Sequence, residues 1–151
     1  MYEQFTRFVG NESGPRCLYK LDDDNVINAE KRLGFLFPIE IRTFYLEIGY
    51  GFWQQGIDDL EDSYNTNRIM SPGSIAEIYL DEEHDCRPDE GFRKHELPFF
   101  EVTGFSFLFI KIVPGFRNVV VDCTGDQIAT DFYDFMQQLY HDAKFWLRHL
   151  D

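Results

Sequence analysis

The most regular pattern of apolar and polar positions in the chain lies between residues 38 and 49. Apolar side chains follow the i, i+3, i+4, i+7 spacing of a helix that faces a core, at Ile41, Phe44, Tyr45 and Ile48. Pro38 precedes this stripe, and proline suits the first turn of a helix because its missing N–H would have no partner there. Gly49 follows the stripe, where a left-handed glycine commonly ends a helix. The pattern predicts a helix from Pro38 to residue 48.

Two helices are expected before this one. Residues 1–9 could form a short first helix with Phe5 and Phe8 on its apolar side. The acidic residues 22–24 are suitable N-caps, and their charge favours the positive end of a helix. They predict a second helix whose apolar residues include Val26, Ile27 and Leu33.

Two more helices are expected later in the chain. A segment beginning at residues 71–74 predicts a helix to about residue 80, with Ser74 and Glu77 as a capping box. The last helix begins at Thr130 or Asp131. A coherent apolar stripe from there to residue 150 predicts one long C-terminal helix.

The second half of the chain changes from helical spacing to β-forming runs. Long runs occupy residues 97–102, 105–113 and 118–123, and shorter ones occupy residues 52–53, 68–70 and 127–129. Residues 105–113 are nearly all apolar, as expected of a central strand covered on both faces. We therefore predict one α+β domain over residues 1–151, with a central antiparallel sheet of about four to six strands. N-terminal helices and the long C-terminal helix would flank the sheet.

Composition and charge narrow the possible partners. The chain has 151 residues, 17% of them aromatic, which is enough to bury a core of its own. Its formal net charge is −13, so its surface should repel nucleic acids and anionic membranes and attract basic proteins. No apolar run is long enough to span a membrane, and the first residues lack a secretory signal. Three cysteines at unrelated spacings favour a reduced, cytoplasmic protein.

Acidic residues gather in segments that are candidates for binding a partner. The candidates are Asp58, Asp59, Glu61, Asp62, Asp81, Glu82, Glu83, Asp85, Asp89 and Glu90. For any one of these clusters taken alone, the ordinary interpretation is a solvated, solubilising surface. Charge alone rarely makes a binding hot spot, so Trp53 or Phe52 is a candidate aromatic anchor. The alternative for Trp53 is an ordinary place in the core.

No pattern in the sequence supports catalysis or a cofactor. His84, Cys86 and His95 have irregular spacings that do not match a zinc site. A serine nucleophile motif and a phosphate-binding glycine motif are both lacking. Cys123 is expected to be a small buried residue rather than a nucleophile. We therefore expect a binding protein, not an enzyme, with no metal and no cofactor.

Six motifs occur in order along the chain, at residues 37–38, 44–46, 49–51, 68–72, 96–99 and 130–135. Together they resemble those of the SUKH superfamily, which contains many bacterial toxin-immunity proteins and fungal cell-wall regulators. Phe37 stands where the family usually has leucine, and Tyr50 separates its usual pair of glycines. The resemblance implies an α+β fold with a central antiparallel sheet. For bacterial members it also implies inhibition of a cognate toxin domain, often a nuclease, by direct binding.

Charge and resemblance together lead to one functional expectation. The chain is expected to be an immunity protein that binds and neutralises a cognate toxin domain through an acidic surface. A nuclease toxin would suit this surface because clefts that bind phosphates tend to be electropositive. The alternatives are a non-catalytic regulatory or scaffolding module and, with less support, an uncharacterised enzyme. The sequence does not indicate an oligomeric state.

Overall fold

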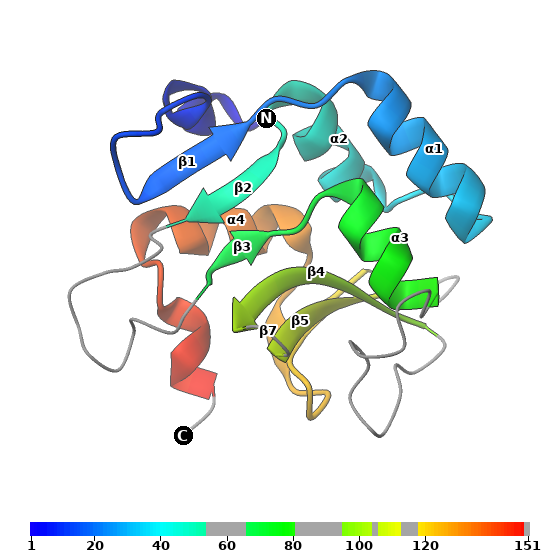
Figure 1. The fold of residues 1–151 in the computed structure, drawn as a ribbon. Coiled ribbons are helices and arrows are strands. Elements are labelled where there is room, and N and C mark those ends of the chain that lie inside the picture. Colours follow the sequence, from blue (N-terminus) through cyan, green and yellow to red (C-terminus); the bar gives the residue numbers. More distant parts are fainter. Residues whose placement is uncertain (54–65, 81–94, 104–105, 113–117, 150–151) are drawn as a thin grey trace.

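The computed structural model describes residues 1–53, 66–80, 95–103, 106–112 and 118–149 (Figure 1). Within these ranges, seven strands form one antiparallel sheet in which each strand pairs with its neighbours in the sequence. The strands are β1 (Arg16–Tyr19), β2 (Tyr50–Trp53), β3 (Arg68–Ile69), β4 (Glu96–Thr103), β5 (Ser106–Lys111), β6 (Val120–Val121) and β7 (Gln127–Ala129). The helices are α1 (Asp23–Leu33), α2 (Ile39–Glu47), α3 (Pro72–Leu80) and α4 (Phe132–His141), with 3-10 helices η1 (Glu3–Phe8) and η2 (Phe145–His149).

The predicted α+β class and antiparallel sheet are confirmed, but the sheet has seven strands rather than four to six. The strand that the sequence did not reveal is β1, whose four residues are too few to show an alternating pattern. It pairs with β2 over its whole length, from Arg16 opposite Trp53 to Tyr19 opposite Tyr50. Its position depends on this distant partner rather than on its own sequence.

The glycines that follow α2 lie directly beside β1. Gly49 and Gly51 have φ values of +133° and +139°, which residues with a side chain rarely adopt. A Cβ atom on Gly49 would overlap the carbonyl oxygen of Tyr19, and one on Gly51 would overlap that of Cys17. The predicted end of α2 at Gly49 is confirmed, and the close approach of β1 gives a second reason for both glycines.

Strand β5 is buried on both faces, as its continuous apolar run predicted. Four consecutive side chains, Phe107, Leu108, Phe109 and Ile110, are all buried. Figure 1 shows α4 behind the sheet and α3 in front of it, with α1 packed against α3. Helix α2 contacts both α1 and α4 and so connects the two sides.

Aromatic side chains fill the space between the sheet, η1, α2 and α4. We call this group the aromatic layer; it consists of Tyr2, Phe5, Phe44, Trp53, Phe99, Phe100, Phe132 and Phe135. A register shift in β4 between Pro98 and Phe100 allows two consecutive rings to face α4. Phe99 and Phe100 both contact Phe135, with centroid separations of 5.0 and 5.3 Å.

The C-terminal helix is shorter than predicted. Asp131 caps α4 by accepting a hydrogen bond from the Asp134 N–H at 2.8 Å, as expected, but α4 ends at His141. Asp142 is extended and its carboxylate accepts from the Lys144 N–H, and the chain then forms η2. Ala143 and Phe145, which follow the end of α4, are also buried. The apolar pattern therefore continues past the break and gives no sign of it in the sequence.

The start of α3 also differs in detail from its prediction. The Ser71 hydroxyl accepts a hydrogen bond from the Ser74 N–H at 3.2 Å, so Ser71 is the capping residue rather than Ser74. Pro72 then occupies the first helical position, which proline favours. Among the described residues, no helix is long and apolar enough to cross a membrane.

Candidate partner-binding surface

A partly buried ion pair joins α1 to α2. Gly34 ends α1 in the left-handed conformation, with φ +82°, and the chain turns back towards α2. Only 6% of Glu30 is exposed, and its carboxylate accepts a hydrogen bond from the Phe37 N–H at 2.8 Å. The Nε–H of Arg42 is shared between both oxygens of this carboxylate, at 3.2 Å each. Glu30 therefore holds the connecting loop and α2 at the same time.

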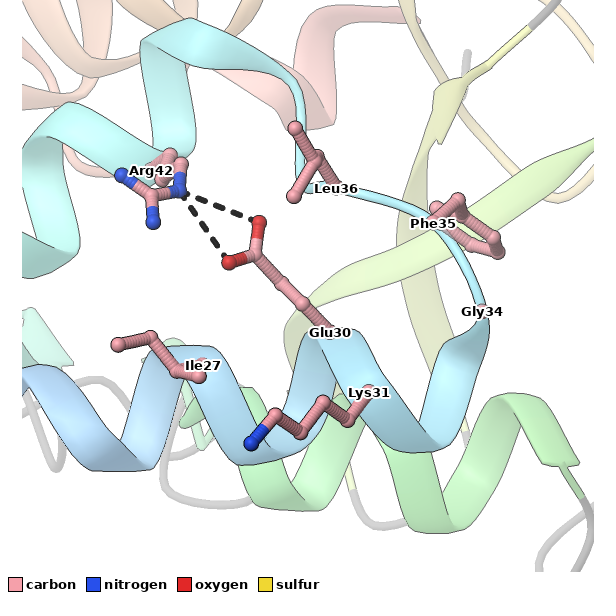
Figure 2. A pocket seen from close by; sticks show the side chains of 7 residues that line it. All are labelled: Ile27, Glu30, Lys31, Gly34, Phe35, Leu36 and Arg42. Carbon is pink, nitrogen blue, oxygen red and sulfur yellow. Dashed lines mark hydrogen bonds and ion pairs between the residues drawn. The ribbon is translucent and has the colours of Figure 1, made fainter.

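A pocket of about 450 Å³ lies beside this ion pair. Figure 2 shows Ile27 and Lys31 on α1 along one side, and Leu36 and Arg42 on the other. The Glu30 side chain points from α1 across the space towards Arg42 (Figure 2). The pocket thus combines apolar walls with two cationic groups, in a chain whose net charge is strongly negative.

Large apolar side chains are exposed on α1, α2 and the segment between them, and two of them, Ile27 and Leu36, line this pocket. The exposed fractions are 72% for Leu36, 67% for Ile39, 38% for Ile27 and 37% for Leu46. We call these four residues the helical face. Single exposed apolar residues are ordinary, but a local group of them beside a pocket is typical of a binding surface. The helical face is therefore the best candidate binding surface among the described residues.

Sequence reasoning missed the helical face because it assigned Ile27 to the core side of its helix. The buried positions of α1 are Val26, Ala29, Glu30 and Leu33. Ile27 lies one residue outside this stripe, and this offset from the helical spacing was the signal in the sequence that it faces solvent. Leu36 and Ile39 flank the turn at Pro38, where helical spacing gives no information about which side faces solvent.

Most residues that the sequence proposed for partner binding lie outside the described ranges. These are Asp58, Asp59, Glu61, Asp62, Asp81, Glu82, Glu83, Asp85, Asp89 and Glu90. Trp53 is described, and it has no exposed surface. Its indole N–H donates to the Leu139 carbonyl at 3.0 Å, and the Arg16 guanidinium lies 4.6 Å from its ring centroid. The core alternative for Trp53 is therefore correct, because a fully covered ring has no surface to offer a partner.

Two buried tyrosines use their hydroxyl groups in hydrogen bonds to backbone carbonyls. Burial raises the pKa of Tyr45 well above its ordinary value, and its hydroxyl donates to the Met70 carbonyl at 2.6 Å. Burial also raises the pKa of Tyr2, whose hydroxyl donates to the Glu40 carbonyl at 2.8 Å. Over the same described ranges, no group of three or more His, Cys, Asp or Glu residues is arranged to hold a metal ion.

Cys123 is exposed, contrary to its prediction as a buried residue. It lies in the turn between β6 and β7 that the buried Asp122 closes. The Asp122 carboxylate accepts from the backbone N–H groups of Thr124 and Asp126, at 2.9 and 3.0 Å. Asp122 occupies the interior side of this turn, and Cys123 is left facing solvent.

Comparison with known proteins confirms the resemblance drawn from the sequence. The SMI1/KNR4 family (SUKH-1) matches residues 20–138, which include α1, α2 and the six strands β2 to β7 but not β1. Immunity protein YxxD of Bacillus subtilis (strain 168) is 28% identical over 138 residues, covering 88% of this chain and 89% of that protein. No solved structure gives a significant match.

Proposed function

We propose that this chain, which belongs to the SMI1/KNR4 family (SUKH-1), is an immunity protein that binds and neutralises a cognate toxin domain. The observation that carries the proposal is the similarity to immunity protein YxxD over nearly the full length of both chains. Such a function requires a binding surface and no catalytic group. A protein of this kind acts by occupying a surface that the toxin needs for its own activity.

Electrostatic attraction is the proposed means of finding the toxin. A chain of net charge −13 is steered towards a basic surface, and the cleft of a nuclease is basic because it binds phosphates. The residues proposed to meet this surface are Asp58, Asp59, Glu61, Asp62, Asp81, Glu82, Glu83, Asp85, Asp89 and Glu90. Trp53 is not part of the proposal because it is buried. Complementary charge of this kind mainly raises the association rate and the specificity.

The first experiment identifies the partner. Tagged protein is captured from its native cells at low and at moderate salt, and the bound proteins are identified by mass spectrometry. A toxin domain that is lost as the salt concentration rises would support electrostatically steered immunity. A housekeeping regulator in its place would contradict the immunity role and favour the regulatory module.

A second experiment tests the acidic surface with the captured toxin domain. Glu82, Glu83 and Asp85 are changed together to lysine, and association rates are measured over a range of salt concentrations. We expect association to slow by about tenfold or more at low salt and its salt dependence to flatten.

The control for this experiment carries the same change of charge elsewhere. It replaces three exposed acidic residues with lysine: Glu12, Glu47 and Asp126. The two variants have equal net charge, so a larger effect at residues 82, 83 and 85 assigns the contact to that segment. Equal effects would show that only net charge matters and would contradict the assignment.

A further inference from the structure

We propose that the helical face is a self-association surface, on which α1 of one copy packs antiparallel to α1 of a second copy across a two-fold axis. The first observation is the set of exposed apolar side chains, Ile27, Leu36, Ile39 and Leu46, on α1, α2 and the segment between them. Two of them, Ile27 and Leu36, line one pocket. A free protein gains nothing by presenting these groups to water together. They indicate a surface that another molecule covers.

The second observation is the order of charges along the exposed side of α1. Asp24, Ile27, Asn28 and Lys31 have helical spacing and are all exposed, so they form one stripe. Asp24 begins the stripe and Lys31 ends it. Within the described residues, neither of these two side chains takes part in an ion pair. Both charges are therefore available to a partner.

The stripe is complementary to itself. Asp24 and Lys31 are equally distant from the midpoint between Ile27 and Asn28. A two-fold axis through that midpoint places Asp24 of each copy opposite Lys31 of the other, because an isologous interface matches each residue pair twice. In this register Ile27 of each copy lies opposite Asn28 of the other copy and next to its Ile27, which lines that copy's pocket.

The helix macrodipole also favours acids at the start of α1 and bases at its end. The charges by themselves would therefore be explained by local helix stability. The exposed apolar residues are not explained in that way, since an exposed Ile27 contributes nothing to the helix that alanine would not. The coincidence of the apolar group with the self-complementary charges is what carries the proposal.

A second copy fits this surface better than a basic toxin does. Glu30 already compensates the charge of Arg42 in the pocket, whereas the Lys31 ammonium would repel a basic partner there. The net charge of each copy opposes association, but salt screens exposed charges beyond about 8 Å at physiological ionic strength. Only the charges close to the interface then matter, and these are complementary.

Charge exchange at α1 tests the proposal on the purified protein by sedimentation equilibrium. We expect reversible dimers, and we expect Asp24→Lys and Lys31→Asp each to raise the dimer dissociation constant by about tenfold or more. The double variant should recover most of the lost affinity because it restores both pairs in exchanged positions. A mixture of the two single variants should form heterodimers, in which every pair is complementary.

Two controls keep the result specific. Asp126→Lys makes the same change of charge as Asp24→Lys on the exposed β6–β7 turn, and it should leave the dissociation constant unchanged. Ile27→Ser should weaken the dimer without any change of charge. Circular dichroism and the thermal midpoint verify that each variant is folded.

Either of two results would overturn the proposal. One is a wild-type protein that stays monomeric up to about 0.5 mM, where even association in the millimolar range is detectable. The other is a dimer that the double variant fails to restore. Neither result bears on the immunity role, since the experiment contains no toxin and the two proposals can fail separately.

Discussion

The aromatic layer and the helical face show two opposite uses of large apolar side chains in one small domain. In the aromatic layer every ring is covered, with exposed fractions of 0–1%. In the helical face Leu36 and Ile39 expose more than two thirds of their surface. The first arrangement gives stability to the isolated chain, and the second gives it only when something covers the face.

The two regions are also held together differently. Rings of the aromatic layer meet edge to face, as Tyr2 and Phe44 do at 5.0 Å and Phe44 and Phe132 do at 5.6 Å. The connection between α1 and α2, next to the helical face, depends instead on one carboxylate, Glu30, which binds Arg42 and the Phe37 N–H. Many weak ring contacts stabilise the aromatic layer, whereas a few strong polar interactions stabilise the connection between α1 and α2.

The largest expected effect comes from removing a ring in the aromatic layer. Phe135 is fully buried and contacts Phe99, Phe100 and Phe145. Phe135→Ala should lower the free energy of unfolding by about 3–5 kcal/mol, measured by urea denaturation, because it removes apolar area and leaves a cavity. Phe135→Leu, which keeps most of the volume, should cost less than about 1.5 kcal/mol. Equal losses for the two variants would contradict the cavity explanation.

A smaller effect is expected at the ion pair between Glu30 and Arg42, which connects α1 to α2. Arg42→Met keeps the aliphatic packing and leaves the buried Glu30 carboxylate with only the Phe37 N–H. We expect a loss of about 2–3 kcal/mol, below that of a fully buried pair because Arg42 is partly exposed. Adding Glu30→Gln should recover part of the loss, since the uncompensated charge is then gone. No recovery in the double variant would show that Arg42 matters through packing rather than charge.

The fold could be predicted wherever a local pattern determined the structure. The stripe from Ile41 to Ile48 gave α2, and the apolar run at residues 105–113 gave the central position of β5. Strand β1 was missed because its pairing with β2 is a contact between segments far apart in the sequence. The break at Asp142 was missed because buried residues continue beyond it, and spacing alone cannot distinguish a long helix from two short ones.

The candidate site was less predictable than the fold. Clusters of acidic residues are visible in any sequence, but all ten proposed acids lie outside the described ranges and remain a prediction. Exposure of apolar side chains, by contrast, depends on how helices pack. Ile27 and Ile39 look like core residues in a sequence, and only the packing of α1 and α2 leaves them facing solvent.

A pH-dependent decrease in stability is expected from Tyr45, a buried residue of α2. Burial raises its pKa above the ordinary value near 10, so the folded protein keeps the proton when the unfolded chain loses it. The stability that Tyr45 contributes is therefore complete below about pH 10 and decreases as the pH rises above that value. Urea denaturation from pH 8 to pH 11 should show this decrease.

The matched variant Tyr45→Phe removes the titrating group. It should cost about 1 kcal/mol at neutral pH, because the Met70 carbonyl loses its hydrogen bond. Its stability should fall less steeply than that of the wild type above pH 10, although Tyr2 still contributes. An identical alkaline slope in the two proteins would assign the fall to other groups.

The smallest expected effect on the free energy of unfolding is at the helical face. It tests whether this face, unlike the aromatic layer, contributes little to the stability of the isolated chain. Leu36→Ser and Ile39→Ser should each change the free energy of unfolding by less than about 0.5 kcal/mol in dilute protein, because the side chains already face water. Binding stabilises a folded protein by an amount that grows with the logarithm of the free partner concentration once that exceeds the dissociation constant. The same variants should therefore be less stable than the wild type only at high protein concentration. A loss above about 1 kcal/mol in dilute solution would place these side chains in the core. The distinction between a covered and a presented apolar region would then be wrong.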